Sequence, residues 1–384
     1  MAGLQDTIGK LSAKRRGPAP SSRLMRESQD FGANPGALRM LSFVPEGLKD
    51  GAPLVVVLHG CTQHAEAFAE SGGWLALAQR CGFAVLSPEQ SPANNPNLCF
   101  NWFRPGDTAR GKGEAASIRN MITALKREHR LGEVFVTGLS AGGAMTAVML
   151  AAYPEVFAGG AVIAGLPYGV AGSVQEAMMA MQGQGGPGAA ELGPILGRAA
   201  PSPKRVPRLS IWHGGADMVV NVGNAQRIAG QWASAHGLAA APDETRMLFG
   251  RSQAIWRAPS GEVAMELNLL PGMGHGSPLA TLGPDGLGSP APFMLETGVS
   301  STLEIARFWG IAPEALAEAP FAGGALAGEV LTREEVAALQ RPAEAPGAGA
   351  HPIGDGVMAA VSPHVSQGIQ ATIAKALRAA GLLG

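Results

Sequence analysis

Short apolar runs of strand length alternate along this chain with longer segments whose apolar residues recur at every third or fourth position. A near-continuous apolar run is typical of a strand buried on both faces, and the wider spacing is typical of an amphipathic helix. The predicted strands cover residues 39–44, 54–58, 83–86, 134–137, 161–163, 209–212, 244–257 and 262–269. The predicted helices cover residues 65–80, 115–129, 144–152, 174–181, 225–236 and 300–309.

Strands that alternate with helices predict an α/β fold, with a mostly parallel central sheet and helices on both faces. The chain has 384 residues, of which 46% are apolar, and this is enough for one large domain with additions. We expect that domain over residues 38–312, after a basic N-terminal arm over 1–37. Residues 171–205 interrupt the alternation and have the position and composition of an insertion or lid. Residues 313–384 form an extension rich in Ala, Gly and Pro, in which 369–383 are compatible with a small amphipathic helix.

Charge and cysteine content narrow the classes of partner. The net charge is −1, so nothing indicates nucleic acid or an acidic membrane as partner. There is no run of eighteen apolar residues, and we therefore expect no transmembrane segment. Residues 1–30 hold six Lys and Arg, but no apolar core of a secretory signal follows, so a cytoplasmic location stays open beside an exported one. The arm is interpreted as a solvated tail rather than a membrane contact.

The main chemical signal is Gly138-Leu-Ser-Ala-Gly142, which lies between a predicted strand and a predicted helix. In that context the G-x-S-x-G pattern predicts a nucleophile elbow with Ser140 as the nucleophile. The turn is so tight that side chains two positions before and after the serine would clash, and glycine stands at both. A glycine-rich turn that only caps a helix is the alternative, which the candidate partners of Ser140 argue against.

A serine hydroxyl is a weak nucleophile at neutral pH and needs a base, which an acidic residue orients. In folds with this elbow the acid follows the serine in the chain and the histidine comes last. His275 lies in a loop bracketed by glycines, directly after a predicted strand. By contrast, His236 lies on a predicted helix, and His351 and His364 belong to the extension. His275 is therefore the predicted base.

Asp217 is the preferred acid because it also follows a predicted strand. Asp243 and Glu244 remain as rivals, although they precede a strand. In this scheme His275 takes the proton of Ser140 and returns it to the leaving alkoxide, while the acid holds the imidazole tautomer.

The negatively charged oxygen of the reaction intermediate needs backbone N–H donors. Ala141 offers one, at the start of the helix after the nucleophile, and the loop after strand 54–58 offers the other, with Cys61 as the main candidate. Trp102 and Asn101 are the candidate substrate-binding residues, although aromatic residues at this spacing are as often part of the core. The chain has three cysteines, so a disulfide scaffold is excluded but one bridge is allowed.

Five motifs together resemble the poly(3-hydroxybutyrate) depolymerase family of esterases, which also includes feruloyl and acetylxylan esterases. They are Leu58-His-Gly-Cys-Thr-Gln63, Cys99-Phe-Asn-Trp-Phe103, Gly138-Leu-Ser-Ala-Gly-Gly143, His213-Gly-Gly-Ala-Asp217 and Gly274-His-Gly276. The resemblance extends over about residues 38–310, and residues 293–309 are similar to the closing helix of that family.

The resemblance implies an α/β-hydrolase fold, ester hydrolysis without a metal or organic cofactor, and a triad of Ser140, Asp217 and His275. It also implies that Cys61 is an oxyanion donor and is bridged to Cys99. Many members are secreted and carry a signal peptide, a linker and a polymer-binding module. This sequence shows none of these recognisably, and we therefore expect it to act faster on soluble oligomers than on crystalline polymer.

Three hypotheses for the function follow. The first is a serine esterase that hydrolyses short-chain polyhydroxyalkanoate polyesters or oligomers, such as those of 3-hydroxybutyrate, through a triad and an acyl-enzyme. The second is a feruloyl or acetylxylan-type carboxylesterase. The third is a non-catalytic protein that binds a granule or surface. The expected partner is a polyester, an oligomer or a small ester, and the sequence leaves the oligomeric state undecided.

Overall fold

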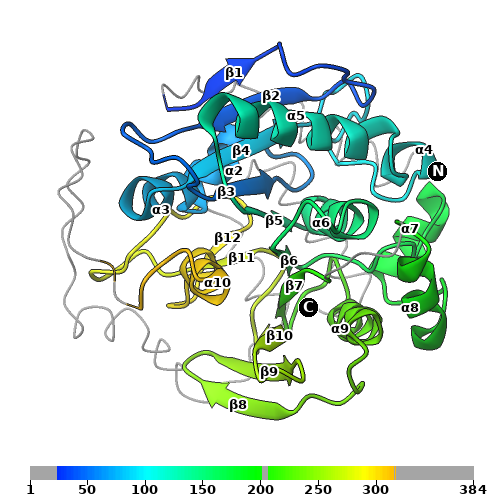
Figure 1. The fold of residues 1–384 in the computed structure, drawn as a ribbon. Coiled ribbons are helices and arrows are strands. Elements are labelled where there is room, and N and C mark those ends of the chain that lie inside the picture. Colours follow the sequence, from blue (N-terminus) through cyan, green and yellow to red (C-terminus); the bar gives the residue numbers. More distant parts are fainter. Residues whose placement is uncertain (1–23, 201–205, 315, 317–384) are drawn as a thin grey trace, which may run out of the picture. The chain divides into compact units, whose positions relative to one another are not determined.

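We describe a computed structural model of the chain for residues 24–200, 206–314 and 316 (Figure 1). Within these residues one ten-stranded sheet has the strand order β1-β2-β4-β3-β5-β6-β7-β10-β9-β8, and β11 and β12 form a separate pair. The strands are β1 (Arg26–Ser28), β2 (Arg39–Phe43), β3 (Leu54–Leu58), β4 (Ala84–Glu89), β5 (Val134–Leu139), β6 (Gly159–Ile163), β7 (Arg208–Gly214), β8 (Glu244–Leu248), β9 (Arg251–Arg257), β10 (Val263–Leu270), β11 (Ser277–Leu279) and β12 (Met294–Glu296).

Helices cover both faces of this sheet, as the sequence predicted. They are α2 (Ala65–Ser71), α3 (Trp74–Cys81), α4 (Pro105–Thr108), α5 (Gly113–His129), α6 (Ala141–Ala152), α7 (Val174–Met181), α8 (Ala189–Gly197), α9 (Gly223–His236) and α10 (Ser301–Trp309). The core on one face includes residues of α5 to α9, and the core on the other includes residues of α2, α3 and α10. No helix among the described residues is both long and apolar enough to cross a membrane.

The six central strands of the sheet are parallel, and the strands at both edges are antiparallel. Alternation along β3 shows why its apolar run is continuous. Leu54, Val56 and Leu58 enter the core on one face, while Val55 and Val57 enter the core on the other. A strand that is covered on both faces needs apolar side chains at every position.

The first strand differs from expectation. The sequence predicted a strand over residues 39–44 and an arm over residues 1–37, but Arg26–Ser28 pair antiparallel with β2 and form the outer strand. Phe31 and Leu38, in the loop between β1 and β2, are buried in the core and anchor that loop. Residues 1–23 of the expected arm lie outside the described residues.

Two elements predicted as continuous are divided at glycines. The helix expected over 65–80 is interrupted at Gly72 and Gly73, and Gly73 has a φ of 80°. The strand expected over 244–257 turns back at Gly250, with a φ of 68°, and becomes the β8–β9 hairpin. Positive φ is readily available to glycine, so these positions could end an element despite apolar neighbours.

The segment expected as an insertion or lid contains α7 and α8. Leu192 and Leu196 of α8 are buried in the core, next to α9. This part of the segment is therefore packed on the domain, and a role as a lid stays a prediction. Residues 201–205 and the helix predicted over 369–383 lie outside the described residues.

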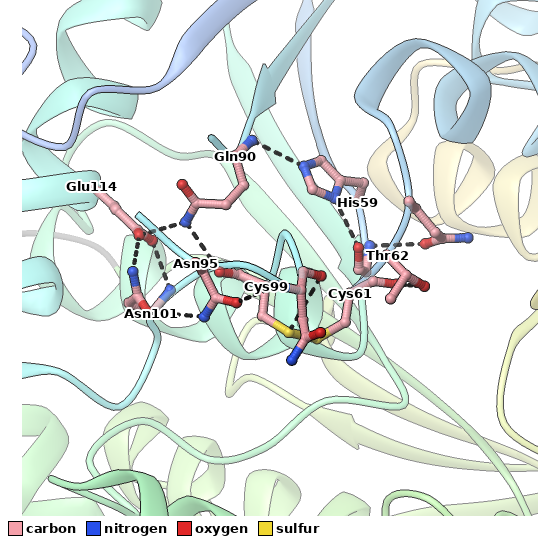
Figure 2. Close-up of a disulfide and its surroundings, with 11 residues drawn as sticks. His59, Cys61, Thr62, Gln90, Asn95, Cys99, Asn101 and Glu114 are labelled. Atoms are coloured by element: carbon pink, nitrogen blue, oxygen red, sulfur yellow. Dashed lines mark hydrogen bonds between the residues drawn. A yellow bond between two sulfur atoms is a disulfide. The ribbon is translucent and has the colours of Figure 1, made fainter. Parts of the chain in front are cut away.

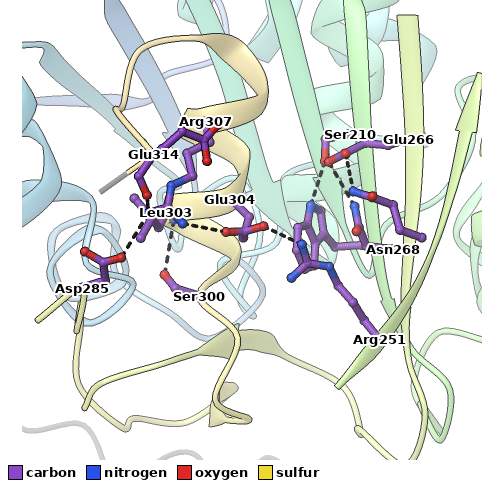
Figure 3. A network of polar contacts seen from close by, with 12 residues as sticks. Ser210, Arg251, Glu266, Asn268, Asp285, Ser300, Leu303, Glu304, Arg307 and Glu314 are labelled. Atoms are coloured by element: carbon purple, nitrogen blue, oxygen red, sulfur yellow. Dashed lines mark hydrogen bonds and ion pairs between the residues drawn. The ribbon is translucent and has the colours of Figure 1, made fainter. Parts of the chain in front are cut away.

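A polar network fastens α10 to the sheet near the site described below (Figure 3). Arg251 of β9 bonds Glu304 of α10, and its guanidinium lies 5.0 Å from the ring of Trp212 in β7. Beside them Glu266 of β10 accepts a hydrogen bond from Ser210 at 2.6 Å. Burial raises the pKa of Glu266, although this bond favours the ionised form. The network joins β7, β9, β10 and α10 into one frame for the loops that follow β7 and β10.

Candidate active site

Ser140 stands at the junction of β5 and α6 in a strained backbone conformation. Its φ is 56° and its ψ is −116°, values that are rare for a residue other than glycine. Two hydrogen bonds hold this turn. The Ser140 N–H donates to the Ile163 carbonyl at 2.9 Å, and the Ala144 N–H donates to the Ser140 carbonyl at 2.9 Å. The hydroxyl of Ser140 has no hydrogen-bond partner among the described residues, so it is free to react.

The glycines of the elbow are required by close backbone contacts. A Cβ on Gly142 would lie 2.1 Å from the carbonyl oxygen of Leu58, and a Cβ on Gly138 would lie 2.5 Å from the backbone of Gly142. Both distances are impossible for a real side chain. The clash that the sequence analysis inferred from the motif therefore exists, and its main partner is the end of the neighbouring strand β3.

His275 and Asp217 form a buried pair at the same sheet edge. The His275 Nδ1–H donates to Asp217 Oδ2 at 2.7 Å. A carboxylate accepts only, so Nδ1 carries the proton and Nε2 keeps its lone pair. An imidazole in this tautomer is ready to accept a proton from a hydroxyl at Nε2. The structure shows no hydrogen bond from Ser140 to His275, and such bonds are often long before substrate binds.

The carboxylate of Asp217 is held from several sides. Its Oδ1 accepts hydrogen bonds from the N–H groups of Val219 and Val220, at 2.8 and 2.9 Å. Burial alone would raise the pKa of Asp217, but hydrogen bonds from His213, His275 and Val220 outweigh it and hold the pKa well below its usual range. Asp217 is therefore ionised at neutral pH.

His213 lies next to this pair. It begins the motif that ends in Asp217, and nothing in the sequence indicated its role. Its Nε2 lies 2.8 Å from the Val220 carbonyl oxygen and 3.4 Å from Asp217 Oδ2. Since a carbonyl only accepts, Nε2 carries the proton. Its Nδ1 is buried and has no partner among the described residues. His213 thus presents an N–H to the turn that carries Asp217.

Backbone hydrogen bonds join the loop after β7, which carries Asp217, to the loop after β10, which carries His275. The N–H of Gly215 donates to the Leu270 carbonyl at 2.8 Å, and that of Ala216 donates to the Met273 carbonyl at 2.9 Å. The backbone of the second loop comes so close that a Cβ on Gly214 would lie 2.3 Å from the Met273 oxygen. The loops after β7 and β10 are therefore one unit.

The loop after β3 brings Gly60, the residue before Cys61, beside Ser140. A Cβ on Gly60 would lie 3.7 Å from the Cβ of Ser140, so the two strand ends touch. The Gly60 N–H donates to Gln63 Oε1 at 2.9 Å, and the Gln63 N–H donates back to the Gly60 carbonyl at 3.3 Å. The Thr62 N–H donates to the Asn97 carbonyl at 2.7 Å. The Cys61 N–H has no such acceptor among the described residues. It therefore remains available to a substrate oxygen.

The second predicted donor, Ala141, is the first residue of α6. The N–H groups in the first turn of a helix have no partner within the helix, and the helix dipole favours negative charge there. The N–H of Ala141 is thus suited to an oxyanion directly beside the nucleophile.

His59 sets the direction of the Cys61 amide. Its Nε2 accepts from the Gln90 backbone N–H at 3.1 Å, so Nδ1 carries the proton and donates to the Gly60 carbonyl at 2.8 Å. Burial lowers the pKa of His59 to about 4, which keeps it neutral. The Gly60 carbonyl and the Cys61 N–H belong to one trans peptide unit and point in opposite directions. Holding the first therefore orients the second.

A disulfide between Cys61 and Cys99 closes this region, and Cys81 is a free thiol. Figure 2 shows Gln90 between Glu114 on one side and His59 on the other. The disulfide and the buried residues around it join the loop after β3, the loop between β4 and α4, and the start of α5.

Glu114, at the start of α5, is the centre of the buried network. It accepts from Gln90 Nε2 at 2.6 Å and from the Nδ2 and the backbone N–H of Asn101, at 2.7 and 2.8 Å. Burial raises the pKa of Glu114 to about 7, although the bonds from Asn101 and Gln90 favour the ionised form. The side chain of Asn101, a candidate substrate-binding residue, is used within this network and is 2% exposed.

Other candidates from the sequence lie as follows. Trp102 is 8% exposed and packs edge-to-face with Phe103, so substrate contact by Trp102 stays a prediction. Asp243 accepts from the Arg257 backbone N–H at 2.7 Å, and Glu244 pairs with Arg246. These two rival acids are thus engaged on the β8–β9 hairpin. Across the described ranges, no group of three or more His, Cys, Asp and Glu is placed to hold a metal ion.

Two further contacts connect the loop after β3 with His275. Gln63 donates from Nε2 to the Pro292 carbonyl at 3.1 Å, and the ring of Phe293, the next residue, lies 5.9 Å from the ring of His275. Phe293 has a φ of 65°, an unusual backbone angle for this residue type. Neither contact has a motif in the sequence that could have revealed it.

Residues 39–253 match the profile of the family described as "Esterase PHB depolymerase". The chain belongs to this PHB depolymerase esterase family. It is 40% identical over 297 residues to poly(3-hydroxyalkanoate) depolymerase C of Paucimonas lemoignei, covering 75% of this chain and 70% of the relative. It is 31% identical over 267 residues to acetylxylan esterase A of Aspergillus oryzae, covering 67% of this chain and 85% of that relative.

Among solved structures, an acetyl xylan esterase from Aspergillus awamori matches with a TM-score of 0.62 at 24% identity, covering 75% of this chain and 99% of that one. That likeness concerns the fold, which is the α/β-hydrolase fold. This member of the PHB depolymerase family is thus an enzyme that hydrolyses carboxylic esters. Its family match includes Ser140 and Asp217 and ends before His275.

Proposed function

We propose that this chain is a serine esterase that hydrolyses short-chain polyhydroxyalkanoates, and in particular oligomers of 3-hydroxybutyrate, through Ser140, His275 and Asp217. The observation that carries the proposal is the His275–Asp217 pair, 2.7 Å apart, at the sheet edge where Ser140 has a strained backbone. The 40% identity to a poly(3-hydroxyalkanoate) depolymerase supports the substrate class.

The geometry supports the following steps. Nε2 of His275 accepts the proton as Ser140 Oγ attacks the ester carbonyl, and the charge on the carbonyl oxygen is stabilised by the N–H groups of Cys61 and Ala141. The C–O bond then breaks, His275 protonates the alkoxide, and an acyl-enzyme remains. Water attacks this ester, loses its proton to His275, and releases the acid. Asp217 stays ionised throughout and stabilises the imidazolium.

The test is a panel of esters with wild type and Ser140→Ala. We expect turnover of 3-hydroxybutyrate dimers and trimers, a loss of several orders of magnitude in kcat with Ser140→Ala, and stoichiometric labelling of Ser140 by a phosphonate. Unchanged activity in Ser140→Ala would refute the assignment, and no turnover of any ester would favour a binding protein.

An acetylxylan or feruloyl esterase is the second candidate, favoured by the 31% identity to an acetylxylan esterase and 29% identity to feruloyl esterase B of Talaromyces stipitatus. Acetylated xylan and methyl ferulate belong in the same panel. Good turnover of either, without turnover of hydroxybutyrate esters, would support this candidate and exclude the first.

A further inference from the structure

A cavity of about 330 Å³ lies between α2 and the segment that precedes β12. Its lining includes Thr62 and Gln63 of the loop after β3, Ala67 and Phe68 of α2, and Ser289 with residues 291–293. Its volume lies at the lower end of the range typical of small-molecule sites. The mechanism described above makes no use of it.

The position of the cavity relative to the base determines which part of a substrate it can receive. Phe293 lines the cavity, and its ring also packs against the ring of His275. During ester cleavage His275 delivers the proton to the departing alkoxide, so the alcohol part of the substrate must lie next to His275. A cavity that begins at Phe293 is therefore on the leaving-group side.

The walls of the cavity resist collapse. Gln63 spans from the loop after β3 to the Pro292 carbonyl, and the Ser289 N–H donates to the Ser71 carbonyl at 2.9 Å at the end of α2. These bonds tie α2 to the opposite segment on both sides. The space is thus a preformed feature of the fold, which lowers the entropic cost of binding.

The chemistry of the lining favours one kind of leaving group. Alanine, proline and phenylalanine side chains contribute Ala67, Phe68, Ala291, Pro292 and Phe293. Hydroxyl groups of a sugar ring that faced these five side chains would lose their hydrogen bonds to water without a new partner there, which is costly. A 3-hydroxyacyl unit instead presents a methyl-bearing chain to the walls and one ester carbonyl.

The other lining residues are polar, namely Thr62, Gln63, His64, Glu70, Ser71 and Ser289. An imidazole N–H or a serine hydroxyl is a suitable donor for an ester carbonyl oxygen. The cavity thus combines apolar side chains with polar groups that can orient a ligand.

We propose that this cavity is a leaving-group subsite that binds the hydroxyacyl unit on the alcohol side of the scissile ester. The assignment rests on the proposed function, because it requires His275 as the proton donor. It makes residues 67 and 291 determinants of specificity, although neither touches the reacting atoms.

The test compares two esters with the same acyl group. Methyl butyrate has a leaving group too small for the cavity, whereas methyl 3-(butyryloxy)butyrate releases butyrate from a hydroxybutyrate unit. Ala67→Phe fills the cavity from an exposed position on α2. We expect this variant to lose about tenfold or more in kcat/KM for butyrate release from the larger ester and to stay within about twofold on methyl butyrate.

The matched control is Ala235→Phe, a helix alanine that lines a separate cavity beside Trp232. It should change neither substrate. If Ala67→Phe does not fold, Ala291→Leu tests the opposite wall with the same two esters. Equal losses on both esters, or no loss on the larger one, would overturn the subsite.

Two other outcomes are distinguishable. A wild type that releases butyrate faster from a butyrylated methyl xyloside than from the hydroxybutyrate ester would overturn the ligand class. Failure of the proposed function would instead appear as Ser140→Ala retaining wild-type rates on methyl butyrate, a substrate that does not involve the cavity.

Discussion

The same dipeptide stands at the ends of two strands on the active-site edge of the sheet: His59-Gly60 follows β3, and His213-Gly214 ends β7. Both imidazoles are buried. His59 carries its proton on Nδ1 and donates to the Gly60 carbonyl, whereas His213 carries it on Nε2 and donates to the carbonyl of Val220. The same residue pair is thus used in opposite tautomers.

In the proposed mechanism the two strand ends serve opposite charges. At β3, His59 holds the Gly60 carbonyl and thereby orients the N–H of Cys61, the proposed donor to the negative charge that develops on the substrate. At β7, His213 adds an N–H to the surroundings of Asp217, which lowers the pKa of that carboxylate. Asp217 is the proposed partner of the imidazolium.

The largest expected effect is at the β7 end. Asp217→Asn keeps an oxygen for the N–H groups of Val219 and Val220 but presents an N–H to Nδ1 of His275, which forces the wrong tautomer. We expect kcat for ester hydrolysis to fall by about 10⁴-fold. Thermal unfolding near the wild-type temperature is the control for an intact fold. A loss of less than tenfold would show that the acid is one of the two residues on the β8–β9 hairpin.

The next largest effect concerns the Cys61–Cys99 disulfide, which joins the loop after β3 to the loop after β4 and has no counterpart at β7. Cys99→Ser opens a loop of 38 residues, which in the chain-entropy model costs about 4 kcal/mol in the free energy of unfolding. Urea unfolding of the oxidised proteins measures this difference. Cys81→Ser, which removes the free thiol, should leave stability nearly unchanged. Equal stability of wild type with and without reductant would contradict the prediction.

A crossed pair of substitutions tests the tautomers directly. Asparagine places an amide N–H near the position of Nδ1, and glutamine places one near Nε2. We therefore expect His59→Asn to retain more activity than His59→Gln, and His213→Gln to retain more than His213→Asn. The unfavourable member of each pair should lower kcat by about 10- to 100-fold, through displacement of groups near the reacting atoms. If the same substituted residue, Asn or Gln, retained more activity at both positions, the opposite tautomers would be refuted.

The smallest effect is a pH dependence at the β3 end. The pKa of Glu114 is about 7 in the folded protein against 4.5 for an ordinary glutamate, so the folded state binds a proton that the unfolded chain releases between these values. The contribution of Glu114 to the free energy of unfolding should fall by about 1 kcal/mol per pH unit as the pH rises through this window, while buried His59, with a pKa of about 4, contributes in the opposite direction. The stability of wild type minus that of Glu114→Gln therefore isolates the slope, and Glu128→Gln, on the exposed side of α5, should behave as the wild type. A difference between wild type and Glu114→Gln that does not fall from pH 5 to pH 7 would contradict the prediction.

Much of this site was predictable because its signals are local. The elbow around Ser140 is recognised from a strand, two glycines and a helix within about a dozen residues. His275 and Asp217 could be selected by their positions directly after strands. The resemblance to the esterase family also implied the Cys61–Cys99 bridge, which the structure contains.

Other features could not be predicted since they depend on residues distant in the sequence. Glu114 sits in a helix pattern and gives no sign that Asn101 and Gln90 will surround it. Asn101 was a candidate substrate-binding residue, while the structure uses its side chain in that network. The outer strand β1 was missed because its three residues, Arg26–Ser28, lack an apolar pattern.

The sequence by itself determined the alternation of strands and helices, the glycine positions of the elbow and the chain order of serine, acid and histidine. These follow from side-chain periodicity and from steric limits on the backbone, which act between neighbours along the chain. Only the tertiary structure decided which ring nitrogen of His59 and of His213 carries the proton, and where a cavity remains beside Phe293. Both depend on which carbonyl, amide or wall arrives from another part of the chain, and that is set by packing rather than by local pattern.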